Sequence, residues 1–246
     1  MLWRRGQAGP TIPRCVQAPH EHQPKEGGRI VAVVAVIFFV WGVAAERIAS
    51  VWPREAASRR PPGPRALVMG AVAAAAAAGI AWRSDLPAWA TAAYLAFLAV
   101  FVALAATDLE QRLLPHALLD PLILGAVAFV PFNPAVSWES ALAGAAVGVA
   151  FLGILGLAMR GGIAAGDLYL VAPLGLLLGL PAAFTALLAA GILAGAASAA
   201  LLLARRVQLG SYIPFGPFLV AGAFFSLLTG PELTEATRAL LPIAVR

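Results

Sequence analysis

The sequence predicts an all-α, polytopic membrane protein with about eight transmembrane helices. Hydrophobic residues make up 61% of the 246 positions, and charged residues make up only 12%. Soluble domains carry about 25% charged residues, so a soluble fold of this length could not bury so much apolar surface. Long uncharged runs recur along the chain, and runs of about 20 apolar residues are typical of membrane-crossing helices.

Three regions follow from the composition. Residues 1–28 are polar, Pro-rich and basic, which predicts a disordered leader. Residues 29–230 hold the apolar runs and form the predicted membrane domain, and residues 231–246 form a short C-terminal tail. In chain order, the eight predicted spans are 29–45, 66–83, 87–106, 117–131, 138–159, 168–181, 183–204 and 213–229.

Local features support the individual spans. The first resembles a signal-peptide core, but it is too long and is followed by further spans, so we predict that it is a membrane helix. Ala-rich stretches at 71–79 and 190–200, in the second and seventh spans, suit close helix packing. The fourth and sixth are short for a ~30 Å bilayer core, which predicts tilted or broken helices. Glycines end the fifth span, and the stretch IPFGP (213–217) opens the eighth.

The placement of arginines predicts the orientation. The loops after spans one, three, five and seven carry nine arginines, whereas the opposite loops carry only Arg83. By the positive-inside rule the arginine-rich loops face the cytoplasm, although the basic leader would then lie outside. Asp108 follows the third span and Asp167 precedes the sixth. Both aspartates are therefore predicted at the cytoplasmic membrane face.

Each polar residue at these helix ends has an ordinary structural interpretation. Asp167 follows Gly166 and precedes an apolar run, as a helix N-cap would. Asp108 could be solvated at the interface or paired with Arg112 at i+4. His116 fits a polar residue at the start of the fourth span.

Taken together, the two aspartates are the groups that aspartic proteolysis needs. One ionised carboxylate draws a proton from water, while the other, protonated, donates to the scissile carbonyl oxygen. At ~4 Å and an effective dielectric of ~20, two negative charges repel by about 4 kcal/mol, so the pair shares one proton. No competing centre is evident, because His20 and His22 lack further ligands, Cys15 is the single cysteine, and neither H-E-x-x-H nor G-x-S-x-G occurs.

Three motifs resemble those of the type IV prepilin peptidases, which are membrane aspartic proteases of the GxGD type. The first aspartate of that family lies in a D-L-x-x-x-x-L-P-D pattern, which here reads DLEQRLLPH from Asp108 to His116. The second lies in a G-x-G-x-G-D-x-K-L pattern, which here reads GIAAGDLYL from Gly162 to Leu170. A later I-P-F-G-P pattern is intact and supplies Pro214, Phe215, Gly216 and Pro217.

The sequence departs from these patterns at three positions. Ala164 stands where the family has a glycine, Tyr169 where it has a lysine, and His116 where it has an aspartate. Alanine lacks the freedom of glycine at positive φ, so we expect the loop before Asp167 to differ in shape. The first cytoplasmic loop also lacks the two Cys-x-x-C pairs of the long-form enzymes, and with them the zinc-bearing element.

The resemblance implies an aspartic endopeptidase that removes the leader of type IV prepilins or pseudopilins at the bacterial inner membrane. Asp108 and Asp167 would be catalytic, and proteolysis would need no metal or other cofactor. Gly162, Gly166 and residues 214–217 would shape the loop or the substrate groove. Many members also methylate the new N-terminus, which would require S-adenosylmethionine if methylation is retained in this chain. The expected partners are the prepilin substrates and the lipid bilayer, and no nucleic acid is expected because the arginines set topology.

The alternative is a non-catalytic scaffold or a transporter of a pilus or secretion system. A transporter would place ionisable residues near the middle of its spans, and the predicted spans contain almost none. A scaffold would tolerate the changes at Ala164 and Tyr169. Cleavage of a prepilin leader would separate the enzyme from both alternatives.

Overall fold

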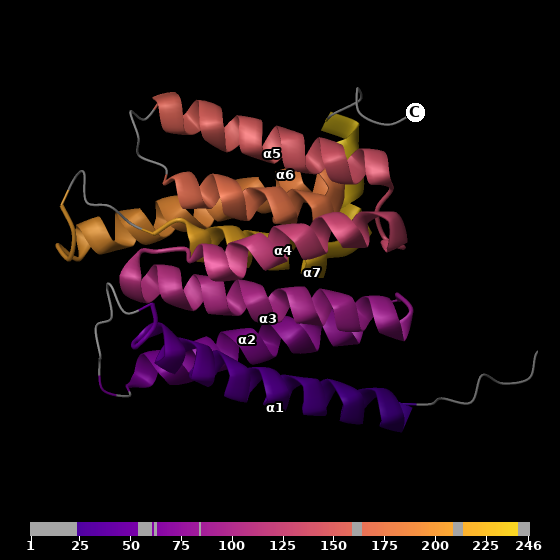
Figure 1. The fold of residues 1–246 in the computed structure, drawn as a ribbon, viewed down its shortest axis with the longest axis horizontal. Helices are drawn as coiled ribbons and strands as arrows, with labels where there is room; N and C mark the ends of the chain where they lie inside the picture. The colour runs from indigo at the N-terminus through magenta and orange to yellow at the C-terminus, as the bar shows by residue number, and fades with distance from the viewer. Residues whose placement is uncertain are drawn as a thin grey trace, which may run out of the picture.

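The computed structural model describes residues 24–53, 61, 63–83, 85–158, 164–208 and 214–240. The elements in these ranges are helices that lie side by side in a bundle (Figure 1). Residues 1–23 of the predicted leader and 241–246 of the predicted tail lie outside the described residues. The helices are α1 (Pro24–Ala49), α2 (Pro64–Arg83), α3 (Ala88–Gln111), α4 (His116–Phe129), the 3-10 turn η2 (Val130–Phe132), α5 (Trp138–Ala158), α6 (Ala165–Leu203) and α7 (Gly216–Leu240).

The predicted helical membrane fold is confirmed, and the chain is a multi-pass membrane protein. Five described helices, namely α1, α2, α3, α5 and α6, are long and apolar enough to cross a membrane. The stretches 116–132 and 216–229 are apolar but shorter, so the predicted count of about eight spans is not confirmed. Large apolar side chains cover the outer faces, with Leu157 83% and Ile192 71% exposed, as lipid-facing positions would be.

The predicted spans 168–181 and 183–204 correspond closely to two arms of α6, which is one element from Ala165 to Leu203 with a sharp kink. Gly179 interrupts it with a non-helical backbone, φ 72° and ψ 171°, which glycine adopts readily. The chain folds back at this point, so both ends of α6 lie at the same end of the bundle (Figure 1). Gly148 of α5 accordingly lies near Val171 of the first arm and Leu187 of the second. The two arms form a helical hairpin.

The reversal at Gly179 frees backbone groups that find partners on neighbouring helices. The carbonyl of Leu177 lies 3.0 Å from the hydroxyl of Tyr94 and accepts a 3.4 Å hydrogen bond from the Asn133 amide. The N–H of Leu180 donates to the hydroxyl of Ser140 at 3.1 Å. Irregular backbone at membrane depth is tolerated only where it is satisfied in this way. The side chains of α3, α5 and the residue after η2 therefore stabilise the hairpin.

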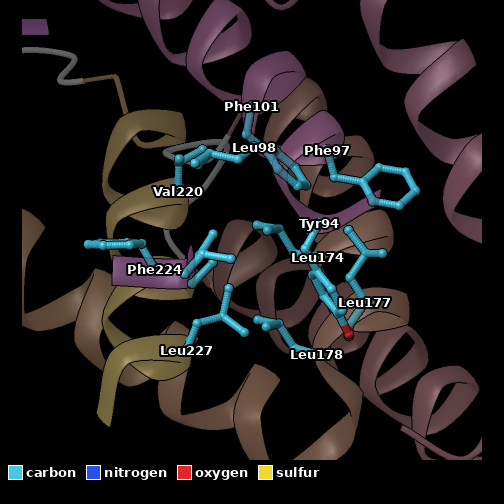
Figure 2. A pocket seen from close by; sticks show the side chains of 12 residues that line it. Tyr94, Phe97, Leu98, Phe101, Leu174, Leu177, Leu178, Val220, Phe224 and Leu227 are labelled. Carbon is cyan, nitrogen blue, oxygen red and sulfur yellow. The ribbon is translucent and has the colours of Figure 1, made fainter. Parts of the chain in front are cut away.

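Two apolar cores hold the helices together. The larger core contains side chains from all five helices from α3 through α7. Its fully buried leucines are Leu104, Leu119, Leu152, Leu170 and Leu219. The smaller joins α1, α2 and α3 around Phe38, Leu98 and Val102. A cavity of about 30 Å³ remains between α3, α6 and α7, where aromatic and leucine side chains converge (Figure 2). Residual space of this size holds about one water molecule, so the helices are closely packed here.

Gly175 is the position at which the contact between α5 and α6 is most sensitive to an added side chain. A Cβ atom added there would overlap the backbone of Ala145, so Gly175→Ala forces the two helices apart. We expect a loss of about 1–3 kcal/mol of unfolding free energy, as other overpacked cores lose. Thermal unfolding of the purified protein in detergent measures this loss.

The control is Gly153→Ala on α5, because nothing lies within 4 Å of a Cβ atom at that position. This variant should unfold at the same temperature as the wild type or higher, since alanine favours helix over glycine. Equal unfolding temperatures for the two variants would contradict the close backbone approach of α5 and α6.

Candidate active site

Asp108 lies in the last turn of α3 and is only 3% exposed. Its backbone carbonyl accepts a hydrogen bond from the N–H of Arg112, which ends the helix in the left-handed conformation with φ 54°. Its carboxylate Oδ2 accepts a 3.1 Å hydrogen bond from the N–H of Gly216, at the start of α7. Arg112 also interacts electrostatically with this carboxylate. Asp108 is therefore buried against α7, and the interpretation as a solvated interfacial side chain is wrong.

Asp167 is the third residue of α6 and is 1% exposed. The N-cap of the helix is Ala164, and no side chain caps the helix, so the interpretation of Asp167 as an N-cap is wrong. Its backbone N–H donates to the carbonyl of Ala164 at 3.0 Å. Its carboxylate Oδ2 is buried and has no hydrogen-bond partner among the described residues. Burial of a carboxylate oxygen without a hydrogen-bond partner lowers the stability of the folded protein. Such a group in a folded protein calls for a functional explanation.

The two carboxylates come from distant parts of the sequence but are close enough to interact electrostatically. Gly216 lies beside both helices that carry them. A Cβ atom on Gly216 would lie 2.7 Å from Oδ2 of Asp108 and 3.5 Å from Cδ2 of Leu170, one turn beyond Asp167. The end of α3 and the beginnings of α6 and α7 therefore meet at one point. Two neighbouring carboxylates in such a place can share one proton and exchange it with a bound water or substrate.

The other predicted site residues lie around this junction. Gly166 is the second residue of α6, and a Cβ atom on it would contact the side chain of Leu114 at 3.0 Å. Pro214 and Phe215 lead into α7 and are partly buried, and Pro217 lines a cavity beside α3. Gly162 lies outside the described residues. The motif IPFGP predicted a special segment here, but it did not predict the hydrogen bond from Gly216 to Asp108.

His116 and Tyr169, which stand where the family patterns have charged residues, lie in contact in the structure. The rings of His116 and Tyr169 lie in an edge-to-face contact, with centroids 5.5 Å apart and an interplanar angle of 74°. His116 begins α4, as predicted, and its Nδ1 lies 3.3 Å from Oδ1 of Asp120. The two positions that differ from the charged residues of the family pattern are therefore in direct contact. The two changes leave both carboxylates of the site in place.

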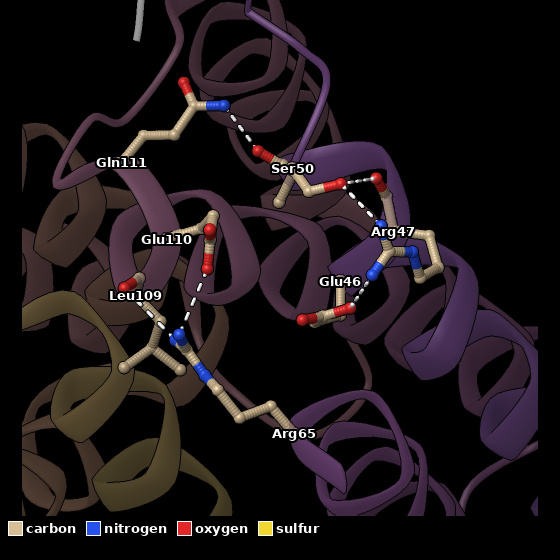
Figure 3. Close-up of polar contacts among 8 residues, drawn as sticks. Glu46, Arg47, Ser50, Arg65, Leu109, Glu110 and Gln111 are labelled. Carbon is tan, nitrogen blue, oxygen red and sulfur yellow. Dashed lines mark hydrogen bonds and ion pairs between the residues drawn. The ribbon is translucent and has the colours of Figure 1, made fainter. Parts of the chain in front are cut away.

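Sequence reasoning missed several polar side chains at the same end of the bundle (Figure 3). The side-chain amide of Gln111 donates to the carbonyls of Ala49 and Trp52, which ties the end of α3 to the end of α1. Arg65 of α2 forms a 3.1 Å ion pair with Glu110. Glu46, near the end of α1, is 5% exposed. The signal for Glu46 was an acidic residue that, with Arg47, interrupts the apolar run at the end of the first helix.

Comparison with known proteins gives a consistent picture. Residues 95–199 match the family model described as the type IV leader peptidase family. A protein of Bacillus subtilis (strain 168), named prepilin leader peptidase/N-methyltransferase, is 32% identical over 56% of this chain and 55% of its own length. A protein of the same name from Aeromonas hydrophila is 35% identical over 61% of this chain and 53% of its own. The chain thus spans about half the length of the curated relatives it matches, and no solved structure matches it.

The contact between Gly216 and Asp108 can be tested by a double-mutant cycle. Gly216→Ala places a methyl group 2.7 Å from Oδ2 of Asp108. We expect it to cost about 1–3 kcal/mol of unfolding free energy, because a well-packed site cannot accept an extra carbon. In a chain that already carries Asp108→Ala the cost should be clearly smaller, since the oxygen that clashes is gone. Equal costs in both chains, measured by thermal unfolding, would mean that the two residues do not touch.

Proposed function

We propose that the chain is a membrane aspartic endopeptidase that cleaves the leader peptide of type IV prepilins or pseudopilins, as its match to the type IV leader peptidase family supports. Asp108 and Asp167 are the catalytic pair of this proposal. The observation that carries it is the burial of both carboxylates at one junction, where they interact electrostatically and Oδ2 of Asp167 has no partner among the described residues. The relatives named as prepilin leader peptidases support the same assignment.

The proposed reaction is peptide hydrolysis by a carboxylate pair that shares one proton. The ionised carboxylate removes a proton from a water molecule as that water attacks the scissile carbonyl carbon. The protonated carboxylate donates its proton to the carbonyl oxygen, which gives a neutral tetrahedral intermediate. As this intermediate collapses the C–N bond breaks, the first carboxylate passes its proton to the leaving amine nitrogen, and the second carboxylate takes a proton from one hydroxyl group of the intermediate. The pair therefore ends the cycle with the one proton with which it began, and its net charge is unchanged.

The N-methyltransferase part of the relatives' names concerns those proteins, and S-adenosylmethionine would be the methyl donor for such a step. The apolar cavity that Pro217 lines is a poor fit for this molecule. Its charged groups, Glu46, Arg65 and Glu110, come from one end of the bundle, and nearly all of the remaining lining is apolar. Adenine and ribose require hydrogen-bond partners along their length, so the proposal includes no methylation step.

The proposed orientation places the catalytic junction at the cytoplasmic face of the bacterial inner membrane. The arginine-rich loops of the sequence support this orientation through the positive-inside rule. About eight crossings would result if α4, α7 and both arms of the α6 hairpin each cross the bilayer. A scaffold or transporter role is not favoured, because curated relatives such as those of Bacillus subtilis and Aeromonas hydrophila carry the peptidase name.

Removal of either carboxylate should abolish cleavage. In cells that co-express a prepilin, Asp108→Asn and Asp167→Asn should each lower processing by at least about a hundredfold, because the proton transfers lose one partner. Immunoblotting resolves the precursor from the shorter product. Asp85→Asn, an exposed aspartate between α2 and α3, is the matched control and should process at the wild-type rate. Substantial cleavage by either of the first two variants would eliminate the catalytic pair.

The orientation can be tested with single cysteines in a chain that carries Cys15→Ser. Leu113→Cys lies between α3 and α4 near the catalytic junction, and Trp82→Cys lies at the end of α2. A membrane-impermeant maleimide should label Trp82→Cys in spheroplasts and Leu113→Cys only in inverted vesicles. The reverse labelling pattern would place the junction outside the cytoplasm.

A further inference from the structure

A long groove lies between α2, α3 and α7, with a volume of about 410 Å³. Its apolar wall is formed by residues such as Val72, Ala76, Leu98, Val102, Val220 and Phe224. On α3 the wall extends from Leu98 to Glu110, which corresponds to roughly 18 Å along the helix axis at 1.5 Å per residue. Beyond the groove, Gly79 of α2 contacts Leu228 and Phe224 of α7, so the two helices converge there. The groove thus extends from one end of the bundle toward its middle.

Charged side chains line the groove only at the end where the catalytic pair lies. Arg65 of α2 donates to Glu110 at 3.1 Å and to the carbonyl of Leu109 at 3.3 Å (Figure 3). The Glu110 side chain is 1% exposed, whereas Arg65 is 43% exposed. The third charged group is Glu46, which comes from α1. The groove therefore has one polar end followed by an apolar body.

Glu46 is the group at this end that most needs a further partner. It is 5% exposed, and its carboxylate Oε2 accepts no hydrogen bond from the described residues. Its ion pair with Arg47 is long, 3.5 Å from Oε2 to Nη1, and another nitrogen of the same guanidinium donates to Ser50 at 3.0 Å. A buried carboxylate with an unsatisfied oxygen gains free energy from a cationic hydrogen-bond donor. A Lys or Arg side chain that enters the groove supplies such a donor.

The groove also adjoins the catalytic pair. Leu109 and Glu110 line it and directly follow Asp108 on α3. Pro217 lines it and directly follows Gly216, whose N–H binds Asp108. A chain lying in the groove with its charged group at Glu46 therefore has its backbone at the level of the catalytic junction. A lipid acyl chain would fill the apolar body, but it would leave Oε2 of Glu46 without a hydrogen-bond donor.

We propose that this groove binds the apolar segment of the peptide substrate, and that Glu46 binds a cationic side chain next to that segment. This inference rests on the proposed peptidase function and adds the binding site to it. Glu46 is a specificity-determining residue, since it contacts the substrate away from the reacting bond.

Crosslinking tests where the apolar segment binds. The enzyme carries Cys15→Ser, the non-cleaving substitution Asp108→Asn, and Val72→Cys in the groove. The probe is a prepilin with one cysteine in its apolar segment, reconstituted with the enzyme in the same vesicles. A disulfide-linked complex should form on mild oxidation. The control, Val40→Cys, lies on α1 outside the groove at similar exposure, 61% against 58% for Val72, and should give no complex.

A charge-pairing experiment tests Glu46 in the cleaving enzyme. Glu46→Gln should lower kcat/KM on a prepilin with a basic leader by about tenfold or more, mainly through KM, because one partner of a buried charge pair is lost. Replacing the basic residue of the prepilin by glutamine should lower wild-type kcat/KM equally and have little added effect on Glu46→Gln. Glu139→Gln, an exposed residue at the start of α5, should behave as wild type.

The outcomes of these experiments distinguish a failure of the groove assignment from a failure of the proposed peptidase function. If wild-type enzyme cleaves the prepilin while Val72→Cys forms no complex, or Glu46→Gln retains full kcat/KM, the groove assignment is wrong and the peptidase function stands. Equal crosslinking at positions 72 and 40 would also overturn the assignment of the groove as the binding site. If wild-type enzyme leaves the prepilin intact, the proposed function is wrong, whatever the crosslinking result.

Discussion

The hydrogen bond from the Gly216 N–H to Oδ2 of Asp108 is the contact on which the candidate site depends. It joins residues 108 positions apart and fixes the start of α7 against the end of α3. A side chain at position 216 would displace the carboxylate, so the close approach requires glycine. Because Gly216 also lies near Leu170, the same contact sets the distance between α3 and the beginning of α6. The two carboxylates are close enough to interact electrostatically because three helix ends converge on one residue without a side chain.

The hairpin in α6 is the second condition for this arrangement. A straight helix of 39 residues would extend about 58 Å, far beyond a bilayer core of ~30 Å. The reversal at Gly179 returns the second arm to the end of the bundle that holds Asp167, and α7 then begins at that end. The polar backbone groups at the reversal bond to Tyr94, Asn133 and Ser140, so the irregular segment is stable within apolar surroundings.

The site and the proposed groove divide two tasks between adjoining surfaces. The electrostatic repulsion that makes two carboxylates share one proton is stronger in a buried site than in water. Substrate binding, in contrast, needs an opening large enough for an apolar segment. Gly216 and Pro217 lie between the two, one against Asp108 and the other in the wall of the groove. The start of α7 therefore lies between the buried Asp108 carboxylate and the groove, and in the proposed enzyme it would separate the reacting groups from the bound substrate.

The sequence by itself determined the helical membrane class, the approximate ends of most helices, and the placement of Asp108 and Asp167 beside those ends. These properties depend on local composition, which hydropathy and motif spacing report directly. Only the tertiary structure decided that Asp167 is not an N-cap, that His116 faces Tyr169, and that Gly216 binds Asp108. Such contacts join residues far apart in the chain. They depend on how closely helix backbones approach each other, which no local pattern in a single sequence encodes. The sequence predicted a break between residues 181 and 183, close to the reversal at Gly179, but it did not predict the contacts that the returning arm makes.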